Sequence, residues 1–269
     1  MKYKTQILFL AHGGGPMPLL GDARHQEMIE CLQEITTKIN KPAAILLISA
    51  HWEESIPTIT AGLNPGLIYD YYGFPEESYS IKYPCIGQPL LAKQIQKVLG
   101  DAGIEAKLDE QRGFDHGVFV PLKIMFPEAD IPCVQLSLVK SLSASEHLTI
   151  GNALQNLDVE NLLVIGSGFS FHNMQAFFAA ETIETKAMNE AFERWLINTC
   201  SSDEINESER ARRLIDWEKA PFARYCHPRE EHLLPLHVCY GFAHAPCSEY
   251  FELSVLNKKT SMYFWTVEC

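Results

Sequence analysis

The sequence has 269 residues, of which 46% are hydrophobic and 21% are charged. This composition is typical of a globular protein and excludes a disordered or fibrous chain. With 22 basic and 34 acidic side chains, the formal net charge is −12. A charge of this sign repels phosphate backbones and anionic lipid surfaces, so we expect no nucleic-acid partner.

No apolar stretch reaches the roughly 18 residues that a membrane helix needs, and the apolar run near the start is too short for a signal peptide. The eight cysteines are scattered singly, without a CxxC pair. Disulfide scaffolds are usually much shorter chains, so this usage is typical of a reduced protein. We therefore predict a cytoplasmic protein that does not bind membranes.

Short β-rich apolar runs alternate with helical stretches along the chain. The expected strands cover residues 6–11, 44–50, 57–62, 132–139, 162–166, 250–256 and 262–267. Between them, residues 22–39 and 89–99 carry apolar side chains at helical spacing. This alternation predicts an α/β fold, with a central mixed sheet flanked by helices and a site at the carboxyl ends of its strands.

The chain contains no internal repeat and no Pro/Gly/Ser-rich linker, which favours a single domain over residues 1–269. One stretch differs in character, from about residue 179 to 220, because it is rich in charged side chains, serine and asparagine. It predicts two solvent-facing helices, one with Phe192, Trp195 and Leu196 as its buried stripe. This stretch is a candidate helical insertion or cap.

Three histidines follow predicted strands. His12 ends the first run and opens a Gly-Gly-Gly-Pro turn, His51 follows residues 44–50, and His172 follows 162–166 and a small-residue loop. Ligands bind at the carboxyl ends of strands in open α/β sheets, so these three side chains can converge although they are remote in sequence. A single histidine after a strand is more often structural, but three such coincidences favour a site.

A fourth cluster occupies residues 227–237 and contains three histidines. Pro228 is expected to open a helix, with His232 one turn in and with Glu230 and Glu231 at its positive end. The three histidines are five residues apart, so at most one of them is expected to share the site. Either glutamate could instead supply a carboxylate ligand.

His116 lies between an aspartate and a glycine, where it can contact a substrate or support a ligand; a surface turn is the alternative. The remaining histidines lack glycine or carboxylate support and are expected at the surface: His25, His147 and His244. The aromatic residues Tyr69, Tyr71, Tyr72 and Phe74 could line a ring-shaped pocket or simply pack. Arg112 is a candidate partner for a substrate carboxylate.

Six motifs occur in a fixed order. They are A-H-G-G-G-P at 11–16, S-A-H-W at 49–52, Y-G-F-P at 72–75, G-F-D-H-G at 113–117, S-G to H-N at 167–173, and E-H-L-L-P-L at 231–236. Together they resemble the class III extradiol ring-cleavage dioxygenases, in the DOPA dioxygenase-like stand-alone branch. The resemblance runs from the first strand to about residue 240.

The resemblance implies a non-haem metal enzyme that inserts O₂ into a catechol-type ring and gives a muconic semialdehyde. It implies that His12, His51 and His232 bind the metal, that His172 is the acid/base residue, and that His116 contacts substrate or oxygen. Protocatechuate-cleaving relatives place a glutamate at the third ligand position. Here that position is His232, as in the DOPA-type branch.

The donor chemistry agrees with iron. Fe(II) in oxygenases is typically held by three protein ligands on one face, which leaves positions open for substrate and oxygen. Three histidines also bind zinc well, and zinc outranks Fe(II) in affinity. We therefore expect Fe(II) as the cofactor and allow for Zn(II) in purified protein.

Two other functions remain open. Three histidines beside an acid/base residue also suit a zinc hydrolase, in which a metal-bound hydroxide attacks an ester or amide. A non-catalytic metal-binding protein on the same scaffold is the second alternative. The glycines at 13–15 lack the spacing of a phosphate-binding loop. The sequence leaves open which catechol is the substrate, and whether the protein is a homo-oligomer.

Overall fold

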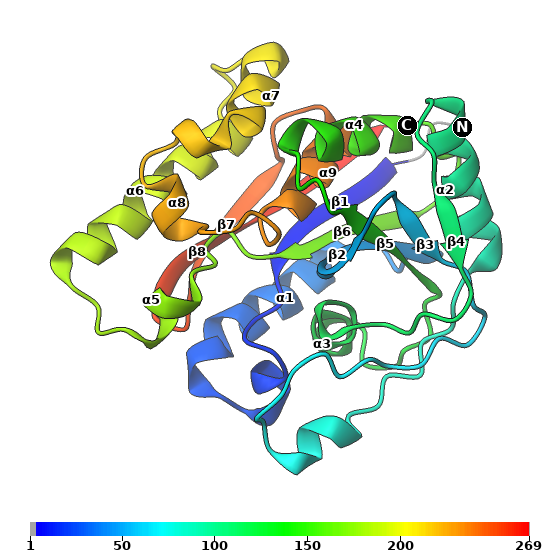
Figure 1. Cartoon of the computed structure of the whole chain (residues 1–269), viewed down its shortest axis with the longest axis horizontal. Coiled ribbons are helices and arrows are strands. Elements are labelled where there is room, and N and C mark those ends of the chain that lie inside the picture. Colours follow the sequence, from blue (N-terminus) through cyan, green and yellow to red (C-terminus); the bar gives the residue numbers. More distant parts are fainter. Residues whose placement is uncertain (1–3, 269) are drawn as a thin grey trace.

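The computed structural model of the chain describes residues 4–268. Within this range, eight strands form one mixed sheet in the order β4-β3-β5-β2-β6-β1-β8-β7 (Figure 1). The four central strands run parallel: β5 (Cys133–Val139), β2 (Ala44–Glu54), β6 (Leu162–Gly168) and β1 (Lys4–Ala11). The predicted α/β fold with a mixed sheet is confirmed.

Antiparallel pairing occurs toward both edges of the sheet. Strand β8 (Lys258–Glu268) runs antiparallel to β1, and β7 (Glu249–Val255) pairs with β8. At the other edge, β3 (Thr58–Thr60) runs antiparallel to β5 and parallel to β4 (Lys107–Asp109). Strand β4 was not predicted, because three residues are too few to give a periodic signal.

Helices cover both faces of the sheet. Alternate residues of a strand point to opposite faces, so Leu8 and Leu47 pack under one helical layer while Phe9 and Leu46 pack under the other. The first layer contains α1 (Gln26–Lys38) and α3 (His116–Met125). The second contains α2 (Pro89–Asp101), α4 (Ala144–Leu154), α6 (Ile183–Ser201) and α9 (Leu234–Ala243).

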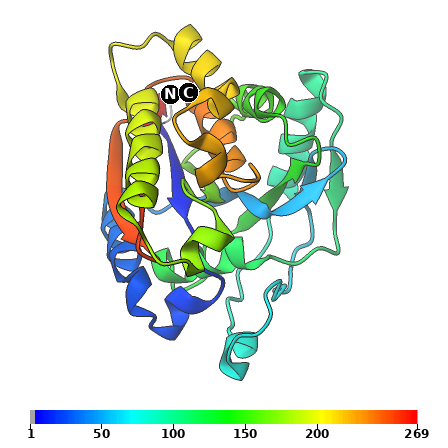
Figure 2. The same ribbon diagram turned by 60° about the vertical axis from the view of Figure 1, so that its left-hand side comes forward.

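The stretch from about 179 to 220 forms the two predicted helices, α6 and α7 (Glu207–Ile215), and Figure 2 shows α6 in yellow-green beside the sheet. Phe192 and Leu196 are fully buried, whereas Trp195 is half-buried. The amide of Asn189 bonds both the N–H and the carbonyl of Lys259 in β8. Helix α6 is thus bound to the sheet, and its status as an insertion remains a prediction.

The remaining elements are short. They are α5 (Met174–Phe178), α8 (Ala223–Cys226) and the 3₁₀ turns at Met17–Leu20, Ala23–His25, Glu76–Ser80 and Trp217–Lys219. No helix within residues 4–268 is both long enough and apolar enough to cross a membrane.

The prediction of a helix beginning at Pro228 was wrong. Residues 228–233 form turns, and α9 begins at Leu234 with Pro235 in its first turn. The reason is a contact with another segment of the same chain. The carbonyl of His232 accepts a hydrogen bond of 2.9 Å from the backbone N–H of Phe169, just beyond β6. His232 is therefore held by backbone pairing outside a helix.

Candidate active site

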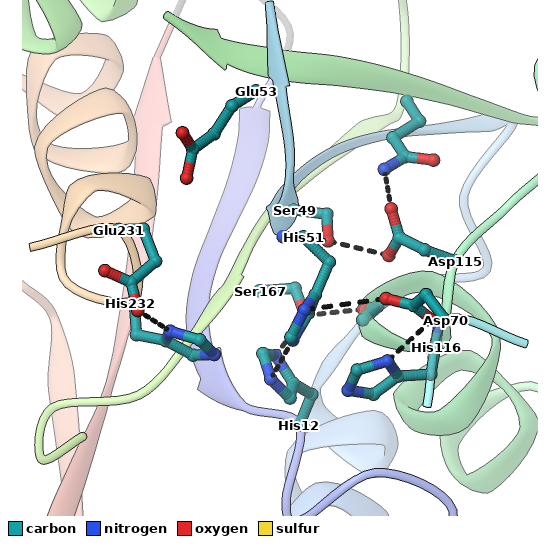
Figure 3. A network of polar contacts seen from close by, with 12 residues as sticks. His12, Ser49, His51, Glu53, Asp70, Asp115, His116, Ser167, Glu231 and His232 are labelled. Carbon is teal, nitrogen blue, oxygen red and sulfur yellow. Dashed lines mark hydrogen bonds and ion pairs between the residues drawn. The ribbon is translucent and has the colours of Figure 1, made fainter. Parts of the chain in front are cut away.

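Five histidines meet at the carboxyl edge of the parallel strands, and Figure 3 shows four of them together. His12 follows β1, His51 lies near the end of β2, and His116 begins α3. His172 follows β6, and His232 precedes α9. The strand β2 continues to Glu54, so His51 lies within the strand and not after it as expected. All five predicted site residues are brought together.

Three of the rings form a nearly equilateral group. The centroids of His12 and His51 are 4.8 Å apart, those of His51 and His232 are 5.0 Å apart, and those of His12 and His232 are 5.2 Å apart. The other two rings flank this group. The His116 centroid lies 3.9 Å from that of His51, and the His172 ring stacks on His232 at 3.4 Å.

The tautomer of His12 follows from its contact with Ser167. The Nδ1 atom of His12 lies 3.0 Å from the hydroxyl oxygen of Ser167, and that hydroxyl donates its hydrogen to the carbonyl of Gly117. A hydroxyl has only one hydrogen to donate, so Ser167 must accept from His12 Nδ1–H. The Nε2 atom of His12 is therefore left with a free lone pair.

One carboxylate contacts both His51 and His116. Asp70 Oδ1 lies 2.8 Å from His116 Nδ1 and Oδ2 lies 3.5 Å from His51 Nδ1. Burial acts to raise the pKa of Asp70, but its hydrogen bonds with His116 outweigh burial and lower it. An ionised carboxylate can only accept, so Nδ1 carries the hydrogen in His116, and the carboxylate favours the same tautomer in His51, which it faces without a hydrogen bond.

A second carboxylate contacts the other two histidines. Glu231 Oε1 lies 2.8 Å from His232 Nδ1 and 3.3 Å from His172 Nδ1. Burial opposes ionisation of Glu231, but the bonds with His172 and His232 prevail and hold its pKa well below the usual range. Arg229, which also pairs with Glu53 at 2.7 Å, lies 3.3 Å from Glu231 Oε2. The predicted carboxylate at this position thus faces the histidines.

The facing nitrogens suit a cation. His12 Nε2 and His51 Nε2 are 3.0 Å apart, and both lone pairs point toward the same space. Two lone pairs at this distance repel each other unless a positive charge lies between them. Two nitrogens that bind one metal, each about 2.1 Å from it, would lie roughly 3–3.5 Å apart. The donor set therefore fits a metal.

Geometry alone leaves the third ligand open. The ligand atoms of His12, His51 and His116 lie within 4.8 Å of one another, as do those of His172, Glu231 and His232. Only the near-equal ring spacing favours His232 as the partner of His12 and His51, because His116 and His172 also have Nδ1 facing a carboxylate.

The rings of this group are uncharged near neutral pH. Burial, followed by the neighbouring histidines, lowers the pKa of His12 and of His51 well below the ordinary value. Burial and His172 lower the pKa of His232 to about 3, although Glu231 acts in the opposite direction. Neutral imidazole is the form that binds metals.

Comparison with known proteins identifies the family. Residues 6–262 match the family described as the catalytic LigB subunit of aromatic ring-opening dioxygenase. The chain belongs to the LigB family. A relative named dioxygenase tasH, from Hapsidospora irregularis, is 40% identical over 255 residues, covering 88% of this chain and 78% of the relative.

Two further matches agree with this assignment. The 4,5-DOPA dioxygenase extradiol of Beta vulgaris is 38% identical over 245 residues, covering 88% of this chain and 87% of the relative. The crystal structure of an uncharacterized Escherichia coli K12 protein aligns with a TM-score of 0.73 at 26% identity, covering 98% of this chain and 99% of the other. The predicted class, an extradiol ring-opening dioxygenase, is confirmed, and LigB dioxygenases are metal-dependent enzymes.

Close packing holds the LigB site in place. Ser49 accepts a hydrogen bond from the backbone N–H of His51 and donates to the buried carboxylate of Asp115. A Cβ atom on Gly117 would lie 2.5 Å from the Ser49 hydroxyl oxygen and 3.3 Å from the His51 ring. Helix α3 can approach β2 this closely only because residue 117 is glycine.

The predictions for His25 and His147 were wrong, because both are fully buried. In each residue, both ring nitrogens form hydrogen bonds within the protein. His25 Nε2 accepts from the N–H of Gly14, beside Gly13 with its left-handed φ of 84°, and so fixes the glycine turn after His12. His147 Nε2 accepts from the N–H of Val139, and its Nδ1 donates to Ser143. His244 is exposed, as predicted.

The other two histidines of the 227–237 cluster stay out of the site, as predicted. His227 contacts the carbonyl of Ser170, and His237 contacts the carbonyls of Leu233 and Leu214.

The structure also shows where the aromatic stretch and Arg112 lie relative to the site. The ring of Tyr71 lies 5.7 Å from that of His116 and contacts Phe74, so it borders the site, while Tyr72 is 92% exposed. The guanidinium of Arg112 lies 4.4 Å from the Trp52 ring and 3.2 Å from Asp115. Arg112 thus makes contacts within the protein, and its role toward a substrate carboxylate stays a prediction.

Sequence reasoning missed Asp70 and Ser167 as partners of the site. Asp70 lies in a long loop between two tyrosines, without a spacing that links it to a histidine. Ser167 is the first residue of the recognised S-G motif, near the end of β6, and its position close to a strand end was the available signal.

Proposed function

We propose that this LigB-family enzyme opens a catechol ring beside its two hydroxyls, with a metal held by His12, His51 and His232. The observation that carries this proposal is the near-equal spacing of these three rings, whose centroids lie 4.8, 5.0 and 5.2 Å apart. Each of the three rings is neutral and has its Nδ1 occupied by Ser167, Asp70 or Glu231, so each offers Nε2 as a ligand.

We propose Fe(II) as the native metal. When bound, Fe(II) coordinates the catechol oxygens and O₂ and conducts electrons between them. Three neutral imidazoles leave the full charge of the ion in place, which suits a catecholate ligand. Zn(II) fits the same donors and can occupy the site in purified protein.

His172 is the proposed acid/base residue. Its ring stacks on the proposed ligand His232, and its Nδ1 faces Glu231 at 3.3 Å. With Nδ1 facing a carboxylate, Nε2 is available to accept a proton from a substrate hydroxyl and later return it. The Glu231 carboxylate stabilises the imidazolium that forms in between.

His116 lies on the opposite side of the ligand group and is proposed to contact substrate or oxygen. Its Nδ1 and its backbone N–H are both bound by Asp70, so the ring is held in one orientation. Tyr71 packs against it with its hydroxyl bound to the carbonyl of Ser78. The Tyr71 ring beside His116 thus gives this side of the site an aromatic surface, as suits an aromatic substrate.

Oxygen uptake tests the proposal. Metal-free protein, protein loaded anaerobically with Fe(II), and protein loaded with Zn(II) are each mixed with a panel of substituted catechols. DOPA is tried first, since it appears in the names of several relatives. We expect stoichiometric O₂ uptake and a yellow semialdehyde with Fe(II) alone. Ester hydrolysis by the Zn(II) form, with no O₂ uptake in any form, would favour the hydrolase alternative.

The cellular setting also stays a proposal. We infer a cytoplasmic enzyme with a small aromatic diol and O₂ as its partners and without nucleic acid. The net charge of −12 and the seven free cysteines among residues 4–268 support this. Size-exclusion chromatography with light scattering measures whether the enzyme is a homo-oligomer.

A further inference from the structure

We infer that Asp70 is a positioning residue that sets the tautomers of His51 and His116 together. Asp70 belongs to the loop between β3 and α2, outside the strand-end motifs, and its carboxylate is the group that contacts both rings. The inference rests on the proposed function, since it assigns His51 to the metal and His116 to the substrate side.

The contacts of Asp70 divide between its two oxygens. Oδ1 accepts from the backbone N–H of His116 at 3.0 Å and from the ring Nδ1 of the same residue at 2.8 Å. Oδ2 faces His51 Nδ1 at 3.5 Å. Asp115, the residue before α3, makes no capping bond with its own side chain. Asp70 therefore caps α3 from a distant loop and fixes its first ring.

The loop that carries Asp70 is held on both sides. The N–H of Ile68 bonds the carbonyl of Phe114 at 2.8 Å, and the N–H of Phe114 bonds the carbonyl of Gly66. The hydroxyls of Tyr69 and Tyr71 donate to the carbonyls of Ile81 and Ser78. The carboxylate is thus fixed relative to α3 before any metal or substrate arrives.

This geometry has a chemical consequence for both rings. An ionised carboxylate only accepts hydrogen bonds, so it holds the hydrogen of each ring on Nδ1 and leaves Nε2 unprotonated. For His51, a free Nε2 is what a metal ligand needs. For His116, it is an acceptor for a substrate hydroxyl. One side chain thus prepares a ligand and a substrate contact at once.

The isosteric variant Asp70→Asn is expected to change the tautomer of one ring and not that of the other. The amide oxygen is expected to keep both donors of His116, because turning it away would place the NH₂ group against two N–H groups. The NH₂ group then faces His51 Nδ1 and donates to it, so the hydrogen of His51 moves to Nε2. His116 keeps its Nδ1–H form, whereas His51 changes.

Imidazole ¹⁵N–¹H spectra of the metal-free full-length protein read these tautomers directly, with signals assigned from His51→Gln and His116→Gln variants. We expect His51 alone to change in Asp70→Asn and both rings to change in Asp70→Ala. Metal titration of Asp70→Asn should show an affinity about 10- to 100-fold weaker. With saturating metal, kcat should fall more than KM rises.

Glu193→Gln is the matched control, since it neutralises another buried carboxylate, between α6 and β8, that touches none of the five histidines. It should leave tautomers and metal affinity unchanged. Unchanged His51 and His116 tautomers in both Asp70 variants would overturn the inference, whether or not metal binding weakened. The spectra need no substrate, so their outcome is independent of whether the enzyme cleaves catechols.

Discussion

At the residue scale, the contact made by Nδ1 distinguishes the histidines of this protein. In His12, His51 and His232 that atom faces Ser167, Asp70 and Glu231, which directs Nε2 into the shared space. In the buried His147, both ring nitrogens are taken by backbone groups, so none is left for a ligand.

The third metal ligand can be tested by comparing two variants. We expect His232→Ala to lose the metal, because the proposed ligand group then has two imidazoles. His116→Ala should retain close to one metal per chain, since His116 lies outside that group. Metal content after reconstitution and desalting measures both. A full metal content in His232→Ala together with loss in His116→Ala would transfer the ligand role to His116.

The acid/base role of His172 predicts a different signature. His172→Ala should keep its metal but lose about 10²- to 10⁴-fold in kcat, the usual contribution of a positioned proton-transfer group. The exposed His244→Ala is the control and should behave as the unaltered enzyme. Steady-state O₂ uptake with metal analysis measures this, and undiminished turnover would remove His172 from the mechanism.

The residues found from sequence and those missed differ in one physical respect. His12 and His172 follow strands and His51 lies near the end of one, and parallel strands bring their ends together, so local pattern predicts their meeting. Asp70 reaches the same place by tertiary packing of a loop that has no periodicity. The burial of His25 likewise depends on the fold of the glycine turn, where its partner Gly14 lies eleven residues upstream.

At the element scale, the approach of α3 to β2 depends on Gly117. A Cβ atom at this position would press on Ser49 and on the His51 ring, so Gly117→Ala should cost about 1–3 kcal/mol of stability and weaken metal binding. Urea unfolding measures the first and metal titration the second.

Gly100→Ala is the matched control. Gly100 lies in the last turn of α2, and a Cβ atom there meets nothing within 4 Å. Alanine loses less conformational freedom on folding, so this variant should gain about 0.5–1 kcal/mol. Equal effects of the two substitutions would contradict a specific contact at Gly117.

The packing of α6 on β8 contains a titratable group. Glu193 accepts from the Ser261 hydroxyl, and burial raises its pKa from 4.5 to about 7. Between these values Glu193 binds more protons in the folded chain than in the unfolded chain, so its contribution to stability falls as pH rises. The loss amounts to as much as about 3 kcal/mol and is complete just above neutral pH.

The variant Glu193→Gln should flatten this dependence, because the amide has no proton to lose. Urea unfolding at about pH 5 and about pH 8 compares the two proteins across the titration. We expect the free energy of unfolding of the variant, relative to that of the unaltered protein, to rise over this interval, because the buried histidines titrate alike in both proteins. An equal change in the free energy of unfolding between the two pH values in both proteins would show that Glu193 does not titrate in this interval.

Element type was more predictable than element position. The strands of the parallel core are apolar runs and were found within a few residues, and α2 began where Pro89 predicts. The start of α9 was missed, because the carbonyl of His232 pairs with the backbone beyond β6 and not within a helix. Such pairing between distant segments leaves no local sequence pattern.

At the scale of the whole molecule, the sheet gathers five histidines from strand ends and flanking segments to one edge. The order of the strands places β1 and β2 on either side of β6, so the carboxyl ends of all three adjoin. The two carboxylates Asp70 and Glu231 then connect the rings in pairs, on opposite sides of the group. The proposed metal and its acid/base residue are thus held by the fold itself.

Isotope labelling of the product tests the central claim most directly. Fe(II)-loaded protein is given one catechol under ¹⁸O₂, and the product is analysed by mass spectrometry with a rapid quench to limit aldehyde exchange. We predict a ring opened beside the two hydroxyls that carries both oxygen atoms of one O₂ molecule. A product cleaved between the hydroxyls, or one that takes no oxygen from O₂, would contradict the account.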